Sequence, residues 1–184
     1  MIRLLIFGPT GSMGRLISKL ALDDNEIDVV AACDVTNIGE DLALFAGTAD
    51  QNNIKIWDVS NLSEIISQTK PDVAVDFTVA SATEKNCLIC AENGIRCVIG
   101  TTALSKEFFD KFEGLIKENH SPAVFSPNMA TGVNVLFKMA SILTRYLADW
   151  DIEVIEAHHH RKIDAPSGTA LKIGQVISDA LGAD

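Results

Sequence analysis

The sequence lacks any apolar run near the ~20 residues that a membrane-spanning helix needs, so we expect no membrane partner. Cations are also few, with 15 Lys and Arg against 25 Asp and Glu and a formal net charge of -10. Nucleic-acid binding depends on clustered Lys and Arg, so no nucleic-acid partner is expected and a small molecule is favoured. The N-terminal MIRLLIFGPTG shows no small-residue cleavage site of a signal peptide, which predicts a cytoplasmic protein.

Cysteine is scarce, and its pattern suits neither a metal knuckle nor a redox turn. Cys33, Cys87, Cys90 and Cys97 lie within apolar segments, where free cysteine packs as a small hydrophobe, so buried thiols are predicted. At 184 residues and 47% hydrophobic composition, the chain can form one full domain with a real core and part of a second.

Apolar, strand-like runs alternate with segments of helical period over residues 1–128. Near-continuous Val, Ile and Ala in these runs is typical of parallel strands that are buried on both faces. The sequence therefore predicts an α/β fold, with a Rossmann-type doubly wound parallel sheet as a dinucleotide-binding domain over residues 1–128. Strands are expected at 2–8, 27–34, 72–78, 96–102 and 123–128, and helices at 12–24, 82–94 and 105–119.

Residues 129–184 predict the beginning of a second, α+β domain. A long amphipathic segment at 135–150 is followed by a strand-like run at 151–160, a polar loop and a last helix at 168–182. One strand cannot form a stable sheet alone, so this strand either pairs with another element or belongs to a longer protein. We expect the domain to be incomplete and the intact protein to be longer.

A glycine pattern follows the first predicted strand. Gly8, Gly11 and Gly14 lie at the strand-to-helix turn, where glycine permits a tight turn and close approach of a pyrophosphate. Asp34 comes twenty residues after Gly14, at the end of the next strand, where an acidic side chain can accept hydrogen bonds from a ribose. The alternative is an ordinary turn with Asp34 as a solvated strand end.

Polar clusters follow three later strands. The carboxyl ends of parallel strands line the ligand crevice of an open sheet, so these clusters are candidates for the same site. Each cluster alone could instead be a turn whose hydroxyls cap the next helix. The clusters are Asp76, Phe77 and Thr78; Gly100, Thr101 and Thr102; and Ser126, Pro127, Asn128 and Met129.

Cations gather in the stretch EAHHHRKIDAPSGTAL at residues 156–171. In an extended segment His158 and His160 share one face and His159 points to the other. Two histidines are fewer than the three or four ligands that zinc usually has, so no metal site is expected. A plain solvated surface is the alternative. The DAPSGT turn predicts a helix start with unpaired backbone N–H groups. Such a helix start beside cations favours a small dicarboxylate as the ligand, and a histidine there can transfer a proton to it.

The chain resembles the 4-hydroxy-tetrahydrodipicolinate reductase (dihydrodipicolinate reductase) family in GPTGSMGR, VDFT, GTT, SPNMATGVN and above all EAHHHRKIDAPSGTAL. The resemblance covers nearly the whole chain. It implies an oxidoreductase of lysine and diaminopimelate biosynthesis that uses NAD(P)H to reduce 4-hydroxy-tetrahydrodipicolinate (dihydrodipicolinate) to tetrahydrodipicolinate. By the same resemblance, His158 is the proton donor with Lys162 as its catalytic cationic partner, and the substrate contacts are His159, Lys162, Ser167, Gly168 and Thr169.

The resemblance also implies a substrate-binding and oligomerisation domain over residues 129–184, and a homotetramer when full length. Val35 stands where some family members carry an arginine that meets a 2'-phosphate, so NADH is expected to be preferred and NADPH possible. Another Rossmann oxidoreductase, or a nucleotide-binding fragment without turnover, are the alternatives. The implied cofactor contacts are Gly8, Pro9, Thr10, Gly11, Ser12, Met13, Gly14, Asp34, Phe77, Thr78, Gly100, Thr101, Thr102, Ser126, Pro127, Asn128 and Met129.

Overall fold

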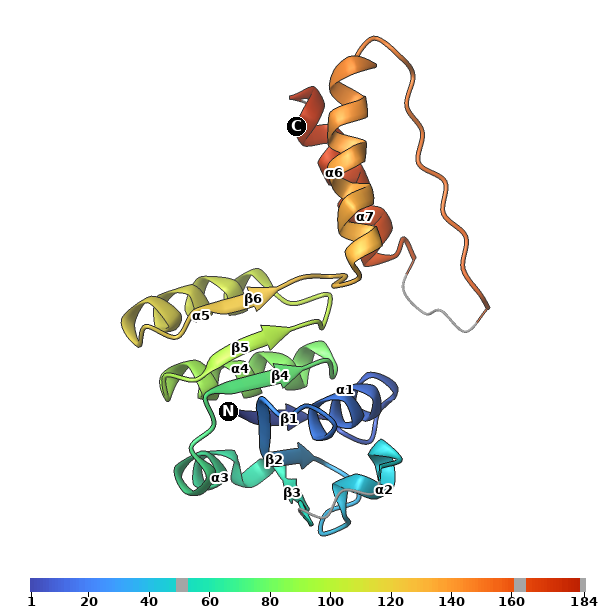
Figure 1. Cartoon of the computed structure of the whole chain (residues 1–184). Coiled ribbons are helices and arrows are strands. Elements are labelled where there is room, and N and C mark those ends of the chain that lie inside the picture. Colours follow the sequence, from blue (N-terminus) through green and yellow to red (C-terminus); the bar gives the residue numbers. More distant parts are fainter. Residues whose placement is uncertain (49–52, 161–164, 183–184) are drawn as a thin grey trace. The chain divides into compact units, whose positions relative to one another are not determined.

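Six parallel strands form one sheet in the order β3-β2-β1-β4-β5-β6 (Figure 1). The computed structural model describes residues 1–48, 53–160 and 165–182, and its chain divides into two units, Met1–Phe125 and Ser126–Asp184. The sheet belongs to the first unit. Its strands are β1 (Ile2–Phe7), β2 (Ile27–Asp34), β3 (Ile56–Asp58), β4 (Val73–Asp76), β5 (Arg96–Ile99) and β6 (Ala123–Phe125).

Helices cover both faces of this sheet, as the buried side chains show. Leu4 and Ile6 of β1 pack in a core with α1 and α2, whereas Leu5 and Phe7 point to the opposite core with α3, α4 and α5. Successive side chains of a strand point to opposite faces, so an unbroken apolar strand supplies both cores. The helices are α1 (Ser12–Leu22), α2 (Leu42–Ala46), α3 (Leu62–Thr69), α4 (Ala80–Glu92) and α5 (Lys106–Glu118), with a 3-10 turn η1 (Val59–Asn61).

The strand order reverses beside β1, and this reversal positions the site. Phe7, the last residue of β1, is in register with Cys33 of β2 on one side and with Asp76 of β4 on the other. The carboxyl ends of β1, β2 and β4 therefore meet at the switch point where open α/β sheets bind ligands. The predicted doubly wound parallel sheet is confirmed. The elements α2, β3, η1 and α3 lie between residues 35 and 71, where no element was predicted.

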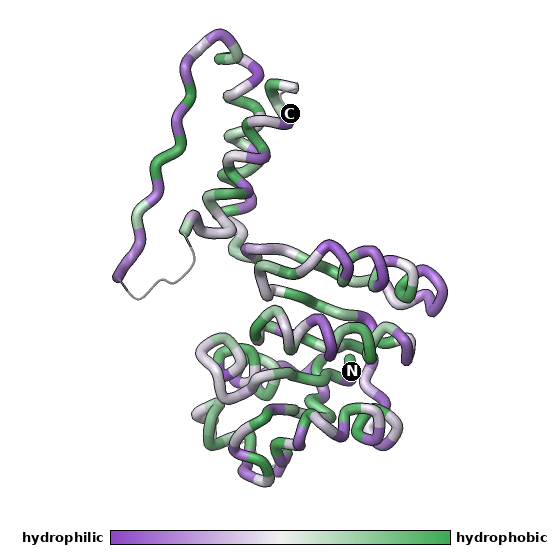
Figure 2. Tube along the Cα trace, turned by 180° about the vertical axis from the view of Figure 1, so that it is seen from behind, coloured by the Kyte–Doolittle hydropathy of each residue, from purple (hydrophilic) through white to green (hydrophobic). Residues whose placement is uncertain are grey.

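The second unit has two described helices, α6 (Thr131–Tyr146) and α7 (Gly168–Leu181), which lie side by side (Figure 1). Between them, residues 151–159 run extended, with apolar and polar residues alternating along the chain (Figure 2). The prediction of a strand over 151–160 is wrong, because these residues pair with no strand of the described chain. Alternation alone does not make a strand when no partner strand accepts its hydrogen bonds. None of the described helices is long and apolar enough to cross a membrane.

Candidate functional site

The turn after β1 tolerates only glycine at two positions. Gly8 has a φ of +62°, and a Cβ built on it would lie 2.6 Å from Cγ2 of Thr78. A Cβ on Gly14 would lie 1.9 Å from the carbonyl oxygen of Gly8, so helix α1 and the turn are in backbone contact. Buried Pro9 completes the turn, and Gly11 donates its N–H to the Gly8 carbonyl at 3.1 Å. The close approach that a pyrophosphate loop requires is present.

The first turn of α1 is open to an anion. Gly11 is the N-cap, so no side chain caps the helix, and Ser12 and Met13 of the first turn are exposed. Backbone N–H groups at such a helix start carry partial positive charge and bind phosphate readily. Arg15 lies one turn further on and donates from Nε to the Thr10 carbonyl at 2.8 Å, which fixes the loop from its far side.

Asp34 ends β2 beside the glycine loop. Its Oδ2 accepts a hydrogen bond from the Thr10 hydroxyl at 2.7 Å, and its Oδ1 accepts one from the Val35 N–H at 2.7 Å. A pocket of about 140 Å³ opens next to this carboxylate. The pocket is lined by Phe7, Gly8, Cys33, Asp34, Val35, Val59, Thr78, Val79, Ala82 and Asn86.

Cys33 lines this pocket as an inert thiol. Burial, followed by the neighbouring charges of Asp34 and Asp58, raises the pKa of Cys33 to about 12. A thiol with so high a pKa holds almost no thiolate near neutral pH, and the thiolate is the nucleophile. All four cysteines are free and buried, which confirms the prediction of buried thiols.

A buried carboxylate, Asp76, organises the ends of β4 and β5. Its Oδ1 accepts hydrogen bonds from the Thr78 N–H at 2.9 Å, the Thr78 hydroxyl at 2.6 Å and the Thr83 hydroxyl at 2.8 Å. Its Oδ2 accepts one from the Asn86 side chain at 3.1 Å. The Thr83 and Thr101 hydroxyls lie 2.7 Å apart. Thr83 is the donor in this last bond, so its single hydroxyl proton is shared between the Thr101 oxygen and the Asp76 carboxylate.

Sequence reasoning missed the part played by Asp76, Thr83 and Asn86. A signal was available in the sequence of α4, which does not divide cleanly into an apolar face and a polar face. Its buried face carries the polar residues Thr83 and Asn86. Polar side chains on a buried helix face need partners, and here the partner is the carboxylate at the end of β4.

Phe77 and Gly100 form a further close approach in the first unit. A Cβ on Gly100 would lie 1.9 Å from the Phe77 ring, so the ring occupies the space that any larger residue at this position would need. Buried Thr101 and half-buried Thr102 follow directly. The predicted cofactor residues from Gly8 to Gly14, together with Asp34, Thr78 and Thr101, are thus brought to one edge of the sheet.

The other predicted cofactor residues, Ser126 to Met129, lie in the second unit. The Ser126 hydroxyl donates to the Asn128 carbonyl at 2.7 Å and closes this turn. The Asn128 side chain donates from Nδ2 to the Thr169 hydroxyl at 3.2 Å. The turn at the start of α6 therefore contacts the first residues of α7, where substrate contacts were predicted.

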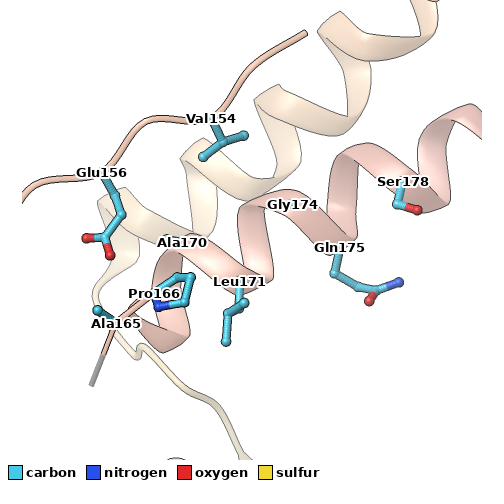
Figure 3. Close-up of a pocket in the computed structure, with 9 residues that line it drawn as sticks. All are labelled: Val154, Glu156, Ala165, Pro166, Ala170, Leu171, Gly174, Gln175 and Ser178. Carbon is cyan, nitrogen blue, oxygen red and sulfur yellow. The ribbon is translucent and has the colours of Figure 1, made fainter. Parts of the chain in front are cut away.

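Ser167 begins helix α7. Its hydroxyl accepts from the Ala170 N–H at 3.1 Å, and its own N–H donates to Oε1 of Glu156 at 3.1 Å. Within the described residues, the N–H groups of Gly168 and Thr169 have no hydrogen-bond partner. At the predicted anion-binding helix start, the Glu156 carboxylate therefore occupies the Ser167 N–H, and the next two N–H groups have no partner among the described residues. A groove of about 660 Å³ beside it runs along α7 (Figure 3).

The histidines lie exposed on the extended segment that approaches α7. His158 contacts Glu156 through its Nδ1, whereas His159 and His160 have no ion-pair partner among the described residues. Lys162, the predicted cationic partner of His158, lies outside the described residues. The pairing of Glu156 with His158 was not predicted, although the two residues share one face of an extended segment.

The strand order, the glycine loop after β1 and the carboxylate after β2 define a Rossmann-type dinucleotide-binding protein. Family models for the dihydrodipicolinate reductase N-terminus and C-terminus match residues 2–129 and 132–183. The chain belongs to the dihydrodipicolinate reductase family, which confirms the resemblance seen in its motifs.

Relatives extend this result. A 4-hydroxy-tetrahydrodipicolinate reductase from Methanosarcina mazei is 45% identical over 182 residues, which cover 99% of this chain and 69% of that protein. A dipicolinate-bound dihydrodipicolinate reductase from Paenisporosarcina sp. TG-14 is similar in structure, with a TM-score of 0.77 and 33% identity over 98% of this chain and 66% of that one. The chain spans about two thirds of the length of these relatives.

A more distant likeness shows the fold alone. An amine dehydrogenase from Mycobacterium smegmatis has a TM-score of 0.59 and 22% identity over 83% of this chain and 45% of that one. The likeness covers the fold, and fold alone does not assign chemistry.

Proposed function

We propose that the chain is a 4-hydroxy-tetrahydrodipicolinate reductase of lysine and diaminopimelate biosynthesis, and that it reduces this cyclic dicarboxylate with NAD(P)H. The match of both halves of the family over almost the whole chain carries the proposal. The geometry supports it: one unit has the glycine loop and Asp34, and the other has a histidine beside a partly open helix start.

The glycine loop fits a dinucleotide. Side chains at Gly8 and Gly14 would collide with their neighbours, so the backbone is bare where a pyrophosphate approaches, and the uncapped start of α1 offers N–H groups. The pocket beside Asp34 suits the adenosine end, with the carboxylate as acceptor for ribose hydroxyls. When bound, the reduced nicotinamide supplies the hydride that the reaction consumes.

NADH is the preferred cofactor in this proposal. Asp34 repels the 2'-phosphate of NADPH, and the apolar, exposed Val35 offers no compensating cation. Arg15 is held by the Thr10 carbonyl and by the Phe45 ring, 5.6 Å from its guanidinium carbon, so it is already engaged.

The start of α7 receives a substrate carboxylate. The N–H groups of Gly168 and Thr169 have no hydrogen-bond partner in the described part of the chain, and the Thr169 hydroxyl accepts a hydrogen bond from Asn128. A dipicolinate-bound relative supports a planar dicarboxylate as the ligand class. His159, Ser167 and Lys162 complete the substrate contacts in the proposal, with Lys162 as the cation that neutralises charge gained by the ring as the hydride arrives.

His158 donates the proton. Loss of the 4-hydroxyl group as water gives a ring with a carbon–carbon double bond. The hydride adds to one carbon of that double bond and a proton to the other, so the products are tetrahydrodipicolinate, oxidised nicotinamide and water. Histidine can hold and release a proton near neutral pH, and a positioned general acid contributes about 10²- to 10⁴-fold to rate. We propose Lys162 as the catalytic partner that stabilises the electron-rich ring until this transfer.

Assembly and location belong to the same proposal. Helix α6 exposes Val135, Leu136, Met139, Leu143 and Tyr146, an apolar surface that supports association into a homotetramer. We propose that the reductase acts in the cytoplasm.

Consumption of NADH on addition of freshly generated substrate tests the function. We expect steady turnover that needs both compounds and that falls sharply in His158→Gln. If the protein binds NADH, by fluorescence titration, and yet consumes none with substrate present, it is a nucleotide-binding module without turnover and the proposal is wrong.

A further inference from the structure

Glu156 joins the histidine to the start of α7. Its Oε1 accepts the Ser167 N–H at 3.1 Å, and its Oε2 faces Nδ1 of His158. The Glu156 side chain is 25% exposed and that of His158 39%, so the pair is partly shielded from water. Figure 3 shows the Glu156 side chain directed toward the residues that begin α7.

The two oxygens of this carboxylate have different neighbours: Oε1 accepts a hydrogen bond from Ser167, and the buried Oε2, which makes no hydrogen bond among the described residues, faces Nδ1 of His158. Ser167 in turn caps α7 through its hydroxyl, so Glu156 is bonded to the N-cap of a helix. His158, by contrast, lies on an extended segment that pairs with no strand among the described residues. A carboxylate that accepts from Nδ1–H fixes both the tautomer and the direction of an imidazole, and leaves Nε2 for chemistry.

We propose that Glu156 is the positioning residue for His158: it anchors the imidazole by Nδ1 to the start of α7 and presents Nε2 to the substrate. The expected effect on kcat rests on the proposed function, whereas the orientation of His158 by Glu156 does not. A purely structural role, in which Glu156 only satisfies the Ser167 N–H and the positive end of α7, would make no use of the contact with His158.

Replacement by glutamine separates the two roles. An amide has one acceptor oxygen where a carboxylate has two, so Glu156→Gln cannot accept from both Ser167 N–H and His158 Nδ1–H. An NH₂ group that faces Nδ1 leaves no acceptor for the second proton of an imidazolium. We expect kcat to fall about 10- to 100-fold, a part of the 10²- to 10⁴-fold that a general acid contributes.

A double-mutant cycle tests whether Glu156 acts through His158. In the His158→Gln background, Glu156→Gln should reduce kcat by less than about twofold, because the group that it positions is gone. Glu153→Gln is the matched control: Glu153 lies on the same extended segment, is exposed and makes no hydrogen bond or ion pair among the described residues, so the variant should keep normal kcat. Equal losses in both backgrounds would overturn the proposal.

Nitrogen NMR of the imidazole gives a readout that needs no turnover. In the unliganded wild-type chain, neutral His158 should carry its proton on Nδ1, and Glu156→Gln should shift the population toward the Nε2–H tautomer, whereas His160 should not change. An Nε2–H tautomer in the wild type would overturn the inference even in an active enzyme. An Nδ1–H tautomer in a protein without reductase activity would uphold the positioning and refute the proposed function.

Discussion

The Thr10 hydroxyl lies 2.7 Å from Oδ2 of Asp34, so a side-chain hydrogen bond joins the glycine loop to the end of β2. The bond holds the carboxylate at the mouth of the pocket lined by Gly8 and Val79. The proposed cofactor site needs both the carboxylate of Asp34 and the close-packed glycine loop, and a separate substitution tests each.

Asp34→Ala should weaken the preference for NADH. Loss of the negative charge removes repulsion of a 2'-phosphate and also removes an acceptor for ribose hydroxyls, so the ratio of kcat/KM for NADH to that for NADPH should fall by about tenfold, or 1.4 kcal/mol. Steady-state kinetics with both cofactors measure it. Asp28→Ala, at the start of the same strand, is the control and should leave the ratio unchanged; a wild type that favours NADPH would contradict the expected preference.

Gly14→Ala should damage the loop itself. The added methyl group would lie 1.9 Å from the Gly8 carbonyl oxygen, and backbone must move to admit it. We expect a loss of about 1–3 kcal/mol in the free energy of unfolding and a large loss of NADH affinity. Gly114→Ala on α5 has open space around the new methyl group and should stabilise the helix by about 0.5–1 kcal/mol. Denaturant unfolding and NADH titration that show no difference between these two variants would refute the close approach.

Asp76→Asn should destabilise the first unit. Asparagine can replace one acceptor oxygen but presents N–H donors where Asp76 accepts from Thr78, Thr83 or Asn86. Hydrogen bonds to a buried charge are worth about 1.5–3 kcal/mol each, so we expect a loss of about 2–4 kcal/mol in denaturant unfolding. Asp110→Asn on the exposed face of α5 should change stability by less than about 0.5 kcal/mol. Equal stabilities of the two variants would show that the network does not need the carboxylate.

His158→Gln should lower kcat by about 10²- to 10⁴-fold and leave NADH affinity unchanged, because a general acid is lost and no cofactor contact is removed. His160→Gln should cost little, since His160 is exposed and contacts no charged group among the described residues. Steady-state kinetics of both variants give the answer. A collapse in His160→Gln with near-normal turnover in His158→Gln would mean that the other imidazole donates the proton.

The sequence alone predicted the parallel sheet and its glycine loop well, because both leave local signals. Apolar runs identify β1 and β2, and glycine is the residue type that the contact of Gly14 with Gly8 demands. Of the four elements that were not predicted between residues 35 and 71, β3 and α2 escaped notice because three and five residues are too few to show a period. Local pattern reveals neither element, and β3 is recognised as a strand by its pairing with β2.

The parts of the site that could not be predicted depend on contacts between distant residues. Asp76 contacts Thr83 and Asn86 only because β4 and α4 pack together. The strand-like pattern at 151–160 likewise gives no information on whether a partner strand is present, and none pairs with it among the described residues. The link between Glu156 and Ser167 spans a loop and is likewise invisible in local sequence. Tertiary partners, rather than propensity, decide these features.

Transfer of deuterium tests the central claim most directly. The protein is given NADH that carries deuterium at the transferable ring position together with freshly generated 4-hydroxy-tetrahydrodipicolinate, and the product is analysed by mass spectrometry. A reductase moves the labelled hydride to carbon, so the tetrahydrodipicolinate product should contain one deuterium, bound to a ring carbon and retained in water. An unlabelled product, or no reduced product at all from a protein that binds NADH, would contradict the assignment.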